Sequence, residues 1–333
     1  MVTMCLDAAI LENCVSAAAA APSVHNTQPW HFRMDPDTVT FRVYAAPERG
    51  LRQTDPLGRA LHLSVGAAVF NLRVAVSHFG WSPVTRLLSR PDEPGLLATL
   101  RPAGSASSRR DDHRTDLYGA VWHRHSSRLP FADAPMPEQT KAELVEAAHR
   151  EGAALRFLPP AETERALRLA TEAEQRNRLD AARGTESRRW VHQDPDDPAD
   201  LGLPWAALGP QDAREHLPMR DFTGEPHPER LRARPFETAP AIALLTTAHD
   251  RRTDWLRAGQ ALEHVLLVAT AHGLRSFLLH QPMEWADLRR GLSPVPYHTG
   301  YAQMLVRLGH GPAGPATPRR APHVVLDSAA RAS

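Results

Sequence analysis

Three polar side chains in one short segment have the types and the spacing to bind a phosphate group. An extended backbone through Arg124-His125-Ser126-Ser127-Arg128 directs Arg124, Ser126 and Arg128 to one side, because successive side chains of a strand point to opposite faces. Planar guanidinium groups suit phosphate oxygens, and each charge-assisted hydrogen bond contributes roughly 1.5 to 3 kcal/mol. A solvated basic loop would have the same composition, but the segment directly precedes a new apolar unit, which favours an anion site.

Other chemistries are excluded by the residue types. Lys141 is the only lysine and lies in an amphipathic helical pattern, so the chain lacks a P-loop lysine and a Schiff-base lysine. Residues 309–314 read Gly-x-Gly-x-x-Gly after a strand-like run, but Pro312, Pro315 and Pro318 prevent the helix that a dinucleotide-binding turn requires. The sequence has no His-Glu-x-x-His, no Gly-x-Ser-x-Gly and no paired cysteines, which argues against a metalloenzyme or a hydrolase.

Composition limits the class of protein further. At 333 residues the chain can hold two core-bearing units, and no apolar run reaches the roughly 18 to 20 residues of a membrane helix, so we expect no membrane partner. A formal net charge of +1, with basic and acidic residues interspersed, argues against nucleic acid. The only two cysteines, Cys5 and Cys14, predict a reducing cytoplasm, and Asp7 and Glu12 stand where a signal peptide would be basic.

Hydrophobic periodicity predicts the elements that position the candidate segments. In the first half we expect helices up to about residue 20 and over 57–80, and strands over 30–34, 39–44, 84–88 and 97–100. In the second half we expect helices over 137–150, 161–183 and 255–272, and strands over 155–158, 239–247, 274–279 and 301–308. A polar linker, 104–112, separates the halves, and recurring prolines in 190–235 exclude a long helix or a central strand there.

Two of these predicted helices indicate an internal repeat. The stretch 66–80 aligns without gaps with 259–273, at an offset of 193 residues (259 − 66 = 193). Both stretches begin and end with glycine, and a strand-like run follows each of them at once. A duplication would give a pseudo-two-fold pair, the single-chain counterpart of a homodimer.

A second short motif gives the segment 124–128 a family context. The segment Pro22-Ser23-Val24-His25-Asn26-Thr27-Gln28-Pro29-Trp30 resembles the Pro-Ser-x-x-Asn-x-Gln-Pro-Trp loop of the nitroreductase superfamily, and residues 124–128 resemble its Arg-x-Ser-x-Arg/Lys strand, which grips the FMN phosphate. In an ordinary nitroreductase the two motifs come in the reverse order, and two identical subunits exchange them. The chain is therefore similar to the tandem, Acg-type branch, in which two halves are fused.

The resemblance implies an α+β fold of two nitroreductase-like halves. Mainly antiparallel sheets flanked by helices would form an intramolecular pseudo-dimer, so the chain could act as a monomer. Residues 1–112 would supply the Pro-Ser loop, and residues 113–333 would supply the phosphate site. The Pro-rich insertion 190–235 could act as a lid.

The resemblance also implies which residues bind FMN. Residues 317–322 resemble the closing Pro-Arg/Lys-x-Arg element, so Arg319 is expected at the phosphate, with Arg320 as the alternative. The strand end His280-Gln281 would lie at flavin N5, and Arg234 or Arg232 would bring positive charge to the ring. The remaining positions are those of the two motifs, namely Arg124, Ser126 and Arg128 at the phosphate and ribityl chain, and Pro22, Ser23, Val24, His25 and Asn26 along the flavin.

The implied function is that of an FMN-dependent oxidoreductase. Hydride from NAD(P)H would pass through flavin N5 to a nitro compound, a quinone or another electron-poor small molecule, with no acid–base side chain required because the cofactor carries the chemistry. One FMN per chain is expected, because the first half lacks Arg-x-Ser-x-Arg and residues 150–154 replace the Pro-Ser loop in the second. The alternative is an FMN-binding protein with little or no turnover, in which the insertion covers the flavin.

Overall fold

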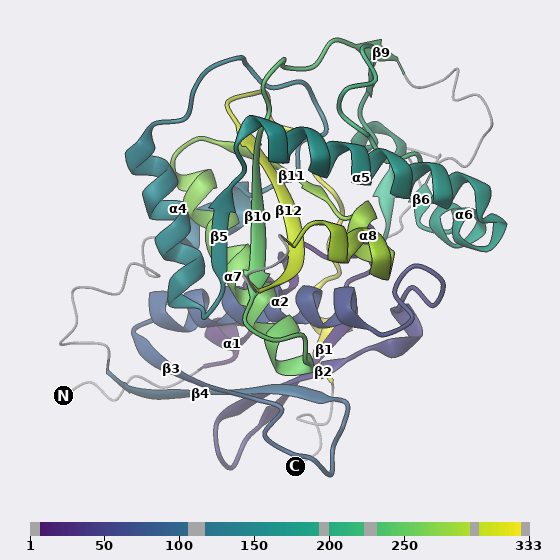
Figure 1. Ribbon diagram of the computed structural model, residues 1–333. Coiled ribbons are helices and arrows are strands. Elements are labelled where there is room, and N and C mark those ends of the chain that lie inside the picture. The colour runs from purple at the N-terminus through teal and green to yellow at the C-terminus, as the bar shows by residue number, and fades with distance from the viewer. Residues whose placement is uncertain (1–6, 106–116, 193–199, 223–231, 294–299, 328–333) are drawn as a thin grey trace.

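The computed structural model describes residues 7–105, 117–192, 200–222, 232–293 and 300–327. Most of the expected linker at 104–112 and parts of the insertion at 190–235 lie outside these ranges, as does Cys5. The fold is a mixture of helices and antiparallel sheets, which confirms the predicted α+β class. It contains two four-stranded sheets, each formed from one side of residue 112 (Figure 1).

The first sheet follows the Pro-Ser loop directly. Its strands are β1 (Trp30–Asp35), β2 (Thr40–Ala45), β3 (Trp81–Leu87) and β4 (Leu96–Ser105), in the order β1-β2-β4-β3. Alternation in β1 buries Trp30 and Phe32, and alternation in β2 buries Phe41 and Val43, so one face of the sheet is apolar. This face packs on the helices between the two sheets.

The second sheet carries the strand ends that border the candidate site. Its strands are β5 (Ala154–Phe157), β10 (Ala241–Thr247), β11 (Arg275–Leu279) and β12 (Tyr301–Gly309), in the order β11-β12-β10-β5. Alternation in β10 sends Ile242 and Leu244 toward α5 (Pro160–Leu179) and Ala243 and Leu245 toward α7 (Arg252–Ala271). Helices therefore cover both faces of this sheet.

Two long helices cross between the sheets at a pair of glycines. Helix α2 (Arg59–His78) packs on the first sheet and α7 on the second, and the two helices meet at Gly66 and Gly259. A Cβ on Gly66 would lie 2.2 Å from the carbonyl oxygen of Leu256, and a Cβ on Gly259 would lie 2.0 Å from that of Leu63. Leu63 and Leu256 are also 193 residues apart (256 − 63 = 193), so the crossing has the symmetry that an internal two-fold requires.

This symmetric crossing supports a duplicated chain. We propose, on the crossing and on the separation of the sheets, that residues 1–112 and 113–333 are the two halves. Helix α2 is also long and apolar enough to cross a membrane, but 89% of its apolar window is buried inside the molecule. It is therefore a core helix, and its length follows from its place between the sheets.

The remaining helices are α1 (Ala8–Ala19), α3 (Tyr118–His123), α4 (Glu138–Arg150), α6 (Ala181–Arg188), α8 (Ala286–Gly291) and α9 (Pro322–Val325). Helices α1 and α4 agree with the prediction, whereas no separate helix was predicted at α3, α6, α8 or α9. The single helix predicted over 161–183 was wrong, because Asp180 leaves helical geometry at the end of α5. Its carboxylate accepts hydrogen bonds from the backbone N–H groups of Ala182 and Arg183, which starts α6 as a separate helix. Short polar residues favour such caps over a helix interior.

The described part of the Pro-rich insertion contains only short elements. Two-residue strands pair in parallel, β6 (Val191–His192) with β7 (Leu203–Pro204) and β8 (Gln211–Asp212) with β9 (Ala233–Arg234). Leu203, Leu208 and Phe222 form a small apolar cluster of their own. Proline prevents longer elements here, as the sequence predicts.

Candidate functional site

One cavity lies at the junction of the two halves, and it receives residues from both sequence motifs. The lining residues from the first half include the loop 22–26 and Ser64 of α2. The second half contributes Arg124, Ser126, Arg128, His280, Gln281 and Arg319. The two segments that resemble one family's cofactor site are thus brought together by the fold.

Ser127, whose side chain faces away from the cavity, holds the segment 124–128 in place. The Ser127 N–H donates to the carbonyl of Ser276 on β11 at 2.9 Å, and its hydroxyl donates to the carbonyl of Pro312 at 3.0 Å. Ser127 is buried on this side, while Arg124, Ser126 and Arg128 line the cavity, as the alternation predicts. His125 lines the cavity as well, so the alternation is not strict at the start of the segment.

The glycine-rich loop after β12 packs against this segment. A Cβ on Gly314 would lie 2.7 Å from the carbonyl oxygen of Ser126, and one on Gly311 would lie 2.7 Å from the ring of Phe131. The backbone at 310–321 forms no helix, in agreement with the prediction from its prolines. The glycines allow a close approach of two backbones instead.

Two arginines from distant parts of the chain meet at one end of the cavity. Arg124 is 2% exposed, and a carbonyl oxygen, that of Ala20, accepts from both Arg124 Nη2 and Arg319 Nε at 3.3 Å. Burial and the neighbouring Arg124 lower the pKa of Arg319 to about 9. A lowered pKa means that the charged form lacks a sufficient counter-charge.

Arg128 lies between two aromatic rings. Its guanidinium carbon is 5.3 Å from the centre of the Phe222 ring and 5.7 Å from that of Phe277, and its Nη1 donates to the carbonyl of Ala207 at 2.9 Å. Burial and the charge of Arg220 lower the pKa of Arg128 to about 10. Aromatic faces hold a guanidinium in place without neutralising it.

Three side chains of the cavity have buried nitrogens without a hydrogen-bond partner in the described part of the chain. They are Nε of Arg128, Nε of Arg124, which instead faces the Glu263 carboxyl at 3.4 Å, and both ring nitrogens of His25, of which one is a donor because burial lowers the pKa of the ring and keeps it neutral. An unpaired buried donor costs free energy, and most such groups in proteins are satisfied. This donor set fits a bound anion such as the phosphate of FMN, which offers several acceptor oxygens.

The Pro-Ser loop has an unusual backbone. His25, Asn26 and Gln28 have φ angles of 51°, 54° and 47°, which place three non-glycine residues in the left-handed region. The Ser23 hydroxyl accepts from the Gln28 N–H at 2.9 Å, and the Ser64 hydroxyl accepts from the Val24 N–H at 3.3 Å. Strain of this kind persists where surrounding contacts impose it, and it concentrates at binding sites.

The Asn26 side chain is occupied by protein groups. Its amide nitrogen donates to the carbonyls of Gly202 at 2.8 Å and Pro318 at 2.9 Å, and its oxygen accepts from Arg319 Nη1 at 2.9 Å. A flavin contact through this amide was the expectation. Asn26 instead joins the loop, the insertion and the C-terminal arginine.

Replacing Asn26 with alanine is expected to weaken FMN binding about tenfold without unfolding the protein. The substitution removes one acceptor of Arg319 and the Asn26 donor to the carbonyls of Gly202 and Pro318, and losses of this kind cost roughly 1 to 3 kcal/mol. The dissociation constant from fluorescence titration of the apoprotein would test this. An unchanged constant would show that Asn26 does not position Arg319.

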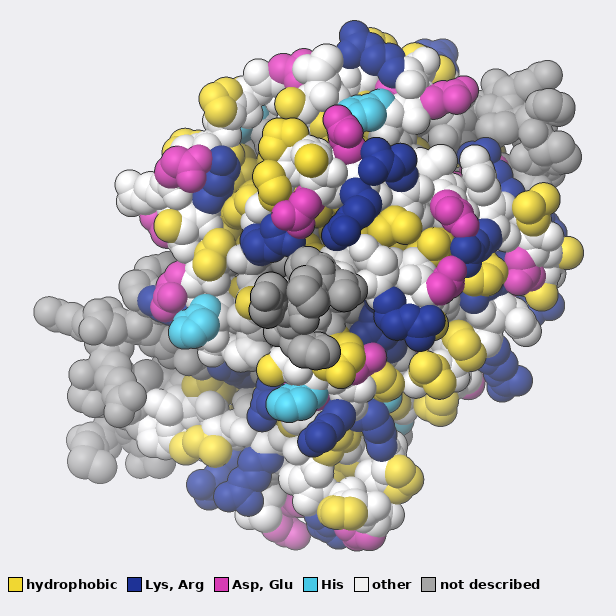
Figure 2. All heavy atoms as spheres, viewed as in Figure 1, with side chains coloured by type: hydrophobic (Ala, Val, Ile, Leu, Met, Phe, Trp, Pro, Cys, Tyr) yellow, Lys and Arg dark blue, Asp and Glu magenta, His cyan; other side chains and the backbone are white. Residues whose placement is uncertain are grey.

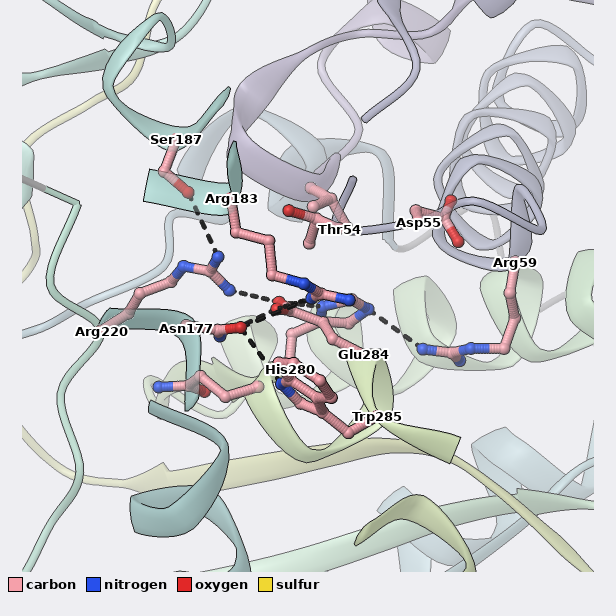
Figure 3. Close-up of polar contacts among 12 residues, drawn as sticks. Thr54, Asp55, Arg59, Asn177, Arg183, Ser187, Arg220, His280, Glu284 and Trp285 are labelled. Carbon is pink, nitrogen blue, oxygen red and sulfur yellow. Dashed lines mark hydrogen bonds and ion pairs between the residues drawn. The ribbon is translucent and has the colours of Figure 1, made fainter. Parts of the chain in front are cut away.

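A buried polar network borders the other end of the cavity (Figure 3). Arg59 Nη2 donates to His280 Nε2 at 3.1 Å, so His280 Nδ1 carries the proton and donates to Glu284 Oε1 at 3.0 Å. Glu284 also accepts from Arg220 and, at 3.0 Å, from Asn177 Nδ2. Burial opposes ionisation of Glu284, but Arg220 and His280 outweigh it and lower its pKa to about 2.

This network binds the side chain of His280, while the expected contact with flavin N5 is one of the strand-end backbone. Both of its ring nitrogens bind protein groups, and burial lowers its pKa, so the imidazole is neutral. Gln281 lines the cavity as expected, and its amide donates to the carbonyl of Pro218 in the insertion at 3.2 Å. The side chains of His280 and Gln281, at the predicted N5 position, therefore bind neighbouring protein groups.

The structure places some of the arginines named from the sequence outside the cavity. Arg234 and Arg232 are exposed around β9 and do not line the cavity, whereas Arg220 does. Arg220 comes from the part of the insertion that has no periodicity, so no sequence pattern distinguished it. Of the two C-terminal arginines Arg319 lines the cavity, while the Arg320 side chain donates to the carbonyl of Val324 at 3.0 Å.

Comparisons with known proteins show the family. The Nitroreductase family model matches residues 121–310. A Mycobacterium tuberculosis protein named "Putative NAD(P)H nitroreductase Rv3131" is 31% identical over 319 residues, which cover 94% of this chain and 90% of that protein. "Putative NAD(P)H nitroreductase acg" of the same organism is 30% identical over 330 residues, covering 93% of each chain.

Solved structures are similar at lower identity. The FMN and NADPH-dependent nitroreductase NfnB from sphigopyxis sp. strain HMH is 19% identical, covers 63% of this chain and 97% of that chain, and has a TM-score of 0.39. The family model matches more than half of the chain, and the two relatives match nearly its whole length. The chain belongs to the Nitroreductase family.

Proposed function

We propose that this protein binds one FMN at the junction of its halves and uses it as an NAD(P)H-dependent oxidoreductase. The observation that carries the proposal is that the guanidinium groups of Arg124, Arg128 and Arg319 line one cavity together with the Pro-Ser loop. Arg124, Ser126 and Arg319 would bind the phosphate, Arg128 would lie along the ribityl chain toward the ring, and the loop 22–26 would lie along the flavin. Bound FMN would supply hydride transfer from NAD(P)H to an electron-poor acceptor such as a nitro compound or a quinone.

Arg220 is the residue that we assign to the ring end of the cavity. Its guanidinium is held by Glu284 and by the Ser187 hydroxyl at 3.3 Å, and both partners are buried. A fixed positive charge there would stabilise negative charge on the reduced ring, and a preorganised charge does this without reorganisation. The network of Figure 3, in which Glu284 also pairs with Arg183, thus holds the Arg220 guanidinium in place.

One FMN per chain follows from the pseudo-symmetry of the two halves. In the first half the Val24 N–H of the Pro-Ser loop donates to Ser64. In the second half the corresponding turn, 150–154, places Gly152 near Arg257. Arg257 corresponds to Ser64, because the two positions are 193 residues apart (257 − 64 = 193). The turn lacks the Pro-Ser sequence, and its Glu151 is buried in ion pairs with Arg73 and His264. We therefore propose that the second site is closed.

A second candidate function is flavin binding with little turnover. The insertion is attached to the cavity at several points: the Gly202 N–H donates to the Asn26 carbonyl at 3.1 Å, and the Ala207 carbonyl binds Arg128. A Cβ on Gly209 would lie 2.6 Å from the Cβ of Arg128, so the two backbones pack closely. A cover of this kind could exclude nicotinamide and acceptor alike.

Anaerobic reduction of the flavin-loaded protein separates the two functions. For an oxidoreductase, NADH or NADPH should bleach the flavin absorbance, and a quinone or nitroaromatic compound should restore it. Dithionite is the control, because a small reductant reaches a flavin that the insertion covers. Bleaching by dithionite alone would reject the enzyme and favour the binding protein.

Charge distribution and thiol chemistry bear on where the protein acts. Basic and acidic side chains are interspersed over the face shown in Figure 2, without a field of one sign that would attract nucleic acid. Cys14 is a buried free thiol, and burial raises its pKa to about 12, so it is unreactive. We propose a cytoplasmic protein that acts on small molecules.

A further inference from the structure

A buried carboxyl group lies directly behind the phosphate end of the cavity. Glu263 on α7 is 0% exposed, and its Oε1 lies 3.4 Å from Nε of Arg124. Neither oxygen of Glu263 accepts a hydrogen bond within the described residues, and Arg124 Nε likewise has no acceptor. This is an ion pair between two buried side chains whose facing atoms form no hydrogen bond.

Burial favours the protonated form of Glu263, and the neighbouring groups favour the ionised form. Burial raises its pKa to about 7, opposed by Arg124, by a polar contact with Asn71 and by Arg319. His125 also lines this end, but burial, Arg124 and Arg319 lower its pKa, so it is neutral. Near neutral pH the carboxyl group is therefore partly ionised, and the two arginines are the charges that face it.

We propose that Glu263 is a proton-linked counter-ion of the phosphate site: its carboxylate balances Arg124 when no phosphate is bound, and it takes up a proton from solvent when a phosphate dianion binds. The proposal rests on the function proposed above and deepens it, because it assigns a role to a residue that does not touch the cofactor. Protons and charge are conserved, because the Glu263 carboxylate and one proton from solvent form a neutral carboxylic acid when the dianion binds.

The physical reason is competition for one guanidinium. A phosphate ester has its second pKa near 6, so above neutral pH it brings about two negative charges to Arg124. A like charge nearby disfavours ionisation, so the bound dianion makes the charged form of Glu263 less favourable. Affinity for FMN should therefore fall as the pH rises from about 7 to 8, by at most about tenfold per pH unit for one proton.

Titration calorimetry of the apoprotein tests the proposal. FMN is titrated at pH 7.5 in two buffers of different ionisation enthalpy, because the difference in heat gives the protons taken up. We expect about half a proton to one proton per FMN, and none for riboflavin, which lacks the phosphate. Glu263→Gln should abolish the uptake, flatten the pH dependence and bind FMN at least as tightly at pH 8.

Glu174 provides a matched control. It is also buried with its pKa raised to about 7, but it accepts from the Asp221 N–H at 2.8 Å and does not line the cavity. Glu174→Gln should retain the proton uptake. Equal uptake in Glu263→Gln, or none in the wild type, would overturn the proposal.

If Glu263→Gln fails to fold, the wild type alone still tests the proposal. Equal proton uptake with FMN and with riboflavin would show that the uptake is not linked to the phosphate, which contradicts the proposal. Absence of any FMN binding is a different result. It would reject the proposed function, and this inference with it.

Discussion

Replacing Arg124 with glutamine is expected to raise the dissociation constant for FMN by about 10- to 100-fold. The substitution removes a buried donor, and a charge-assisted hydrogen bond is worth roughly 1.5 to 3 kcal/mol, where 1.4 kcal/mol is a factor of ten. Glu263 loses its cation in this variant but can become protonated, so the fold should survive. Fluorescence titration gives the constant, and the thermal unfolding midpoint checks the fold.

Arg234→Gln is the matched control for this experiment. Arg234 is exposed on β9 and does not line the cavity, so its loss should leave FMN binding unchanged. Riboflavin should distinguish the variants further, because it lacks the group that Arg124 would bind. If Arg124→Gln bound FMN as tightly as the wild type, the phosphate would lie elsewhere.

Replacing Gly259 with alanine is expected to destabilise the protein by about 3 kcal/mol or more. The new Cβ would lie 2.0 Å from the carbonyl oxygen of Leu63, and backbone cannot rotate away as a side chain can, so α2 and α7 must separate. The symmetry of the crossing predicts a similar loss for Gly66→Ala, whose Cβ would meet Leu256. Urea unfolding measures both effects.

A glycine with open space around it calibrates this prediction. Gly119 lies in α3 with nothing within 4 Å of its Cβ position, so Gly119→Ala should leave the stability unchanged or raise it by up to about 1 kcal/mol. If Gly259→Ala were as stable as this control, the close crossing would be wrong. A large loss for only one of Gly66 and Gly259 would contradict the symmetric contact.

Local sequence patterns predicted the elements well where one periodicity dominates. The apolar spacing of 57–80 predicts a helix because its buried positions recur every three or four residues, and α2 covers 59–78. The alternation at 124–128 predicted the cavity-facing arginines, because the structure extends the chain there and fixes Ser127 on the opposite side. Such patterns depend on neighbouring residues alone.

Contacts between distant residues could not be predicted in this way. Arg220 lies in an aperiodic segment and reaches the cavity only because Glu284, 64 residues away in sequence, binds it. Asn26 was expected to contact the flavin, yet its partners Gly202 and Pro318 come from separate segments. Partners of this kind depend on tertiary packing, and the pattern around either residue gives no signal of the other.

The number of FMN molecules bound per chain tests most directly whether the two halves together form a single FMN phosphate site. The apoprotein is saturated with FMN and freed of excess ligand, and released flavin and protein are then quantified separately. We predict one FMN per chain for the wild type and strongly reduced retention for Arg124→Gln. Two FMN per chain, or full retention by Arg124→Gln, would contradict a single site built on that arginine.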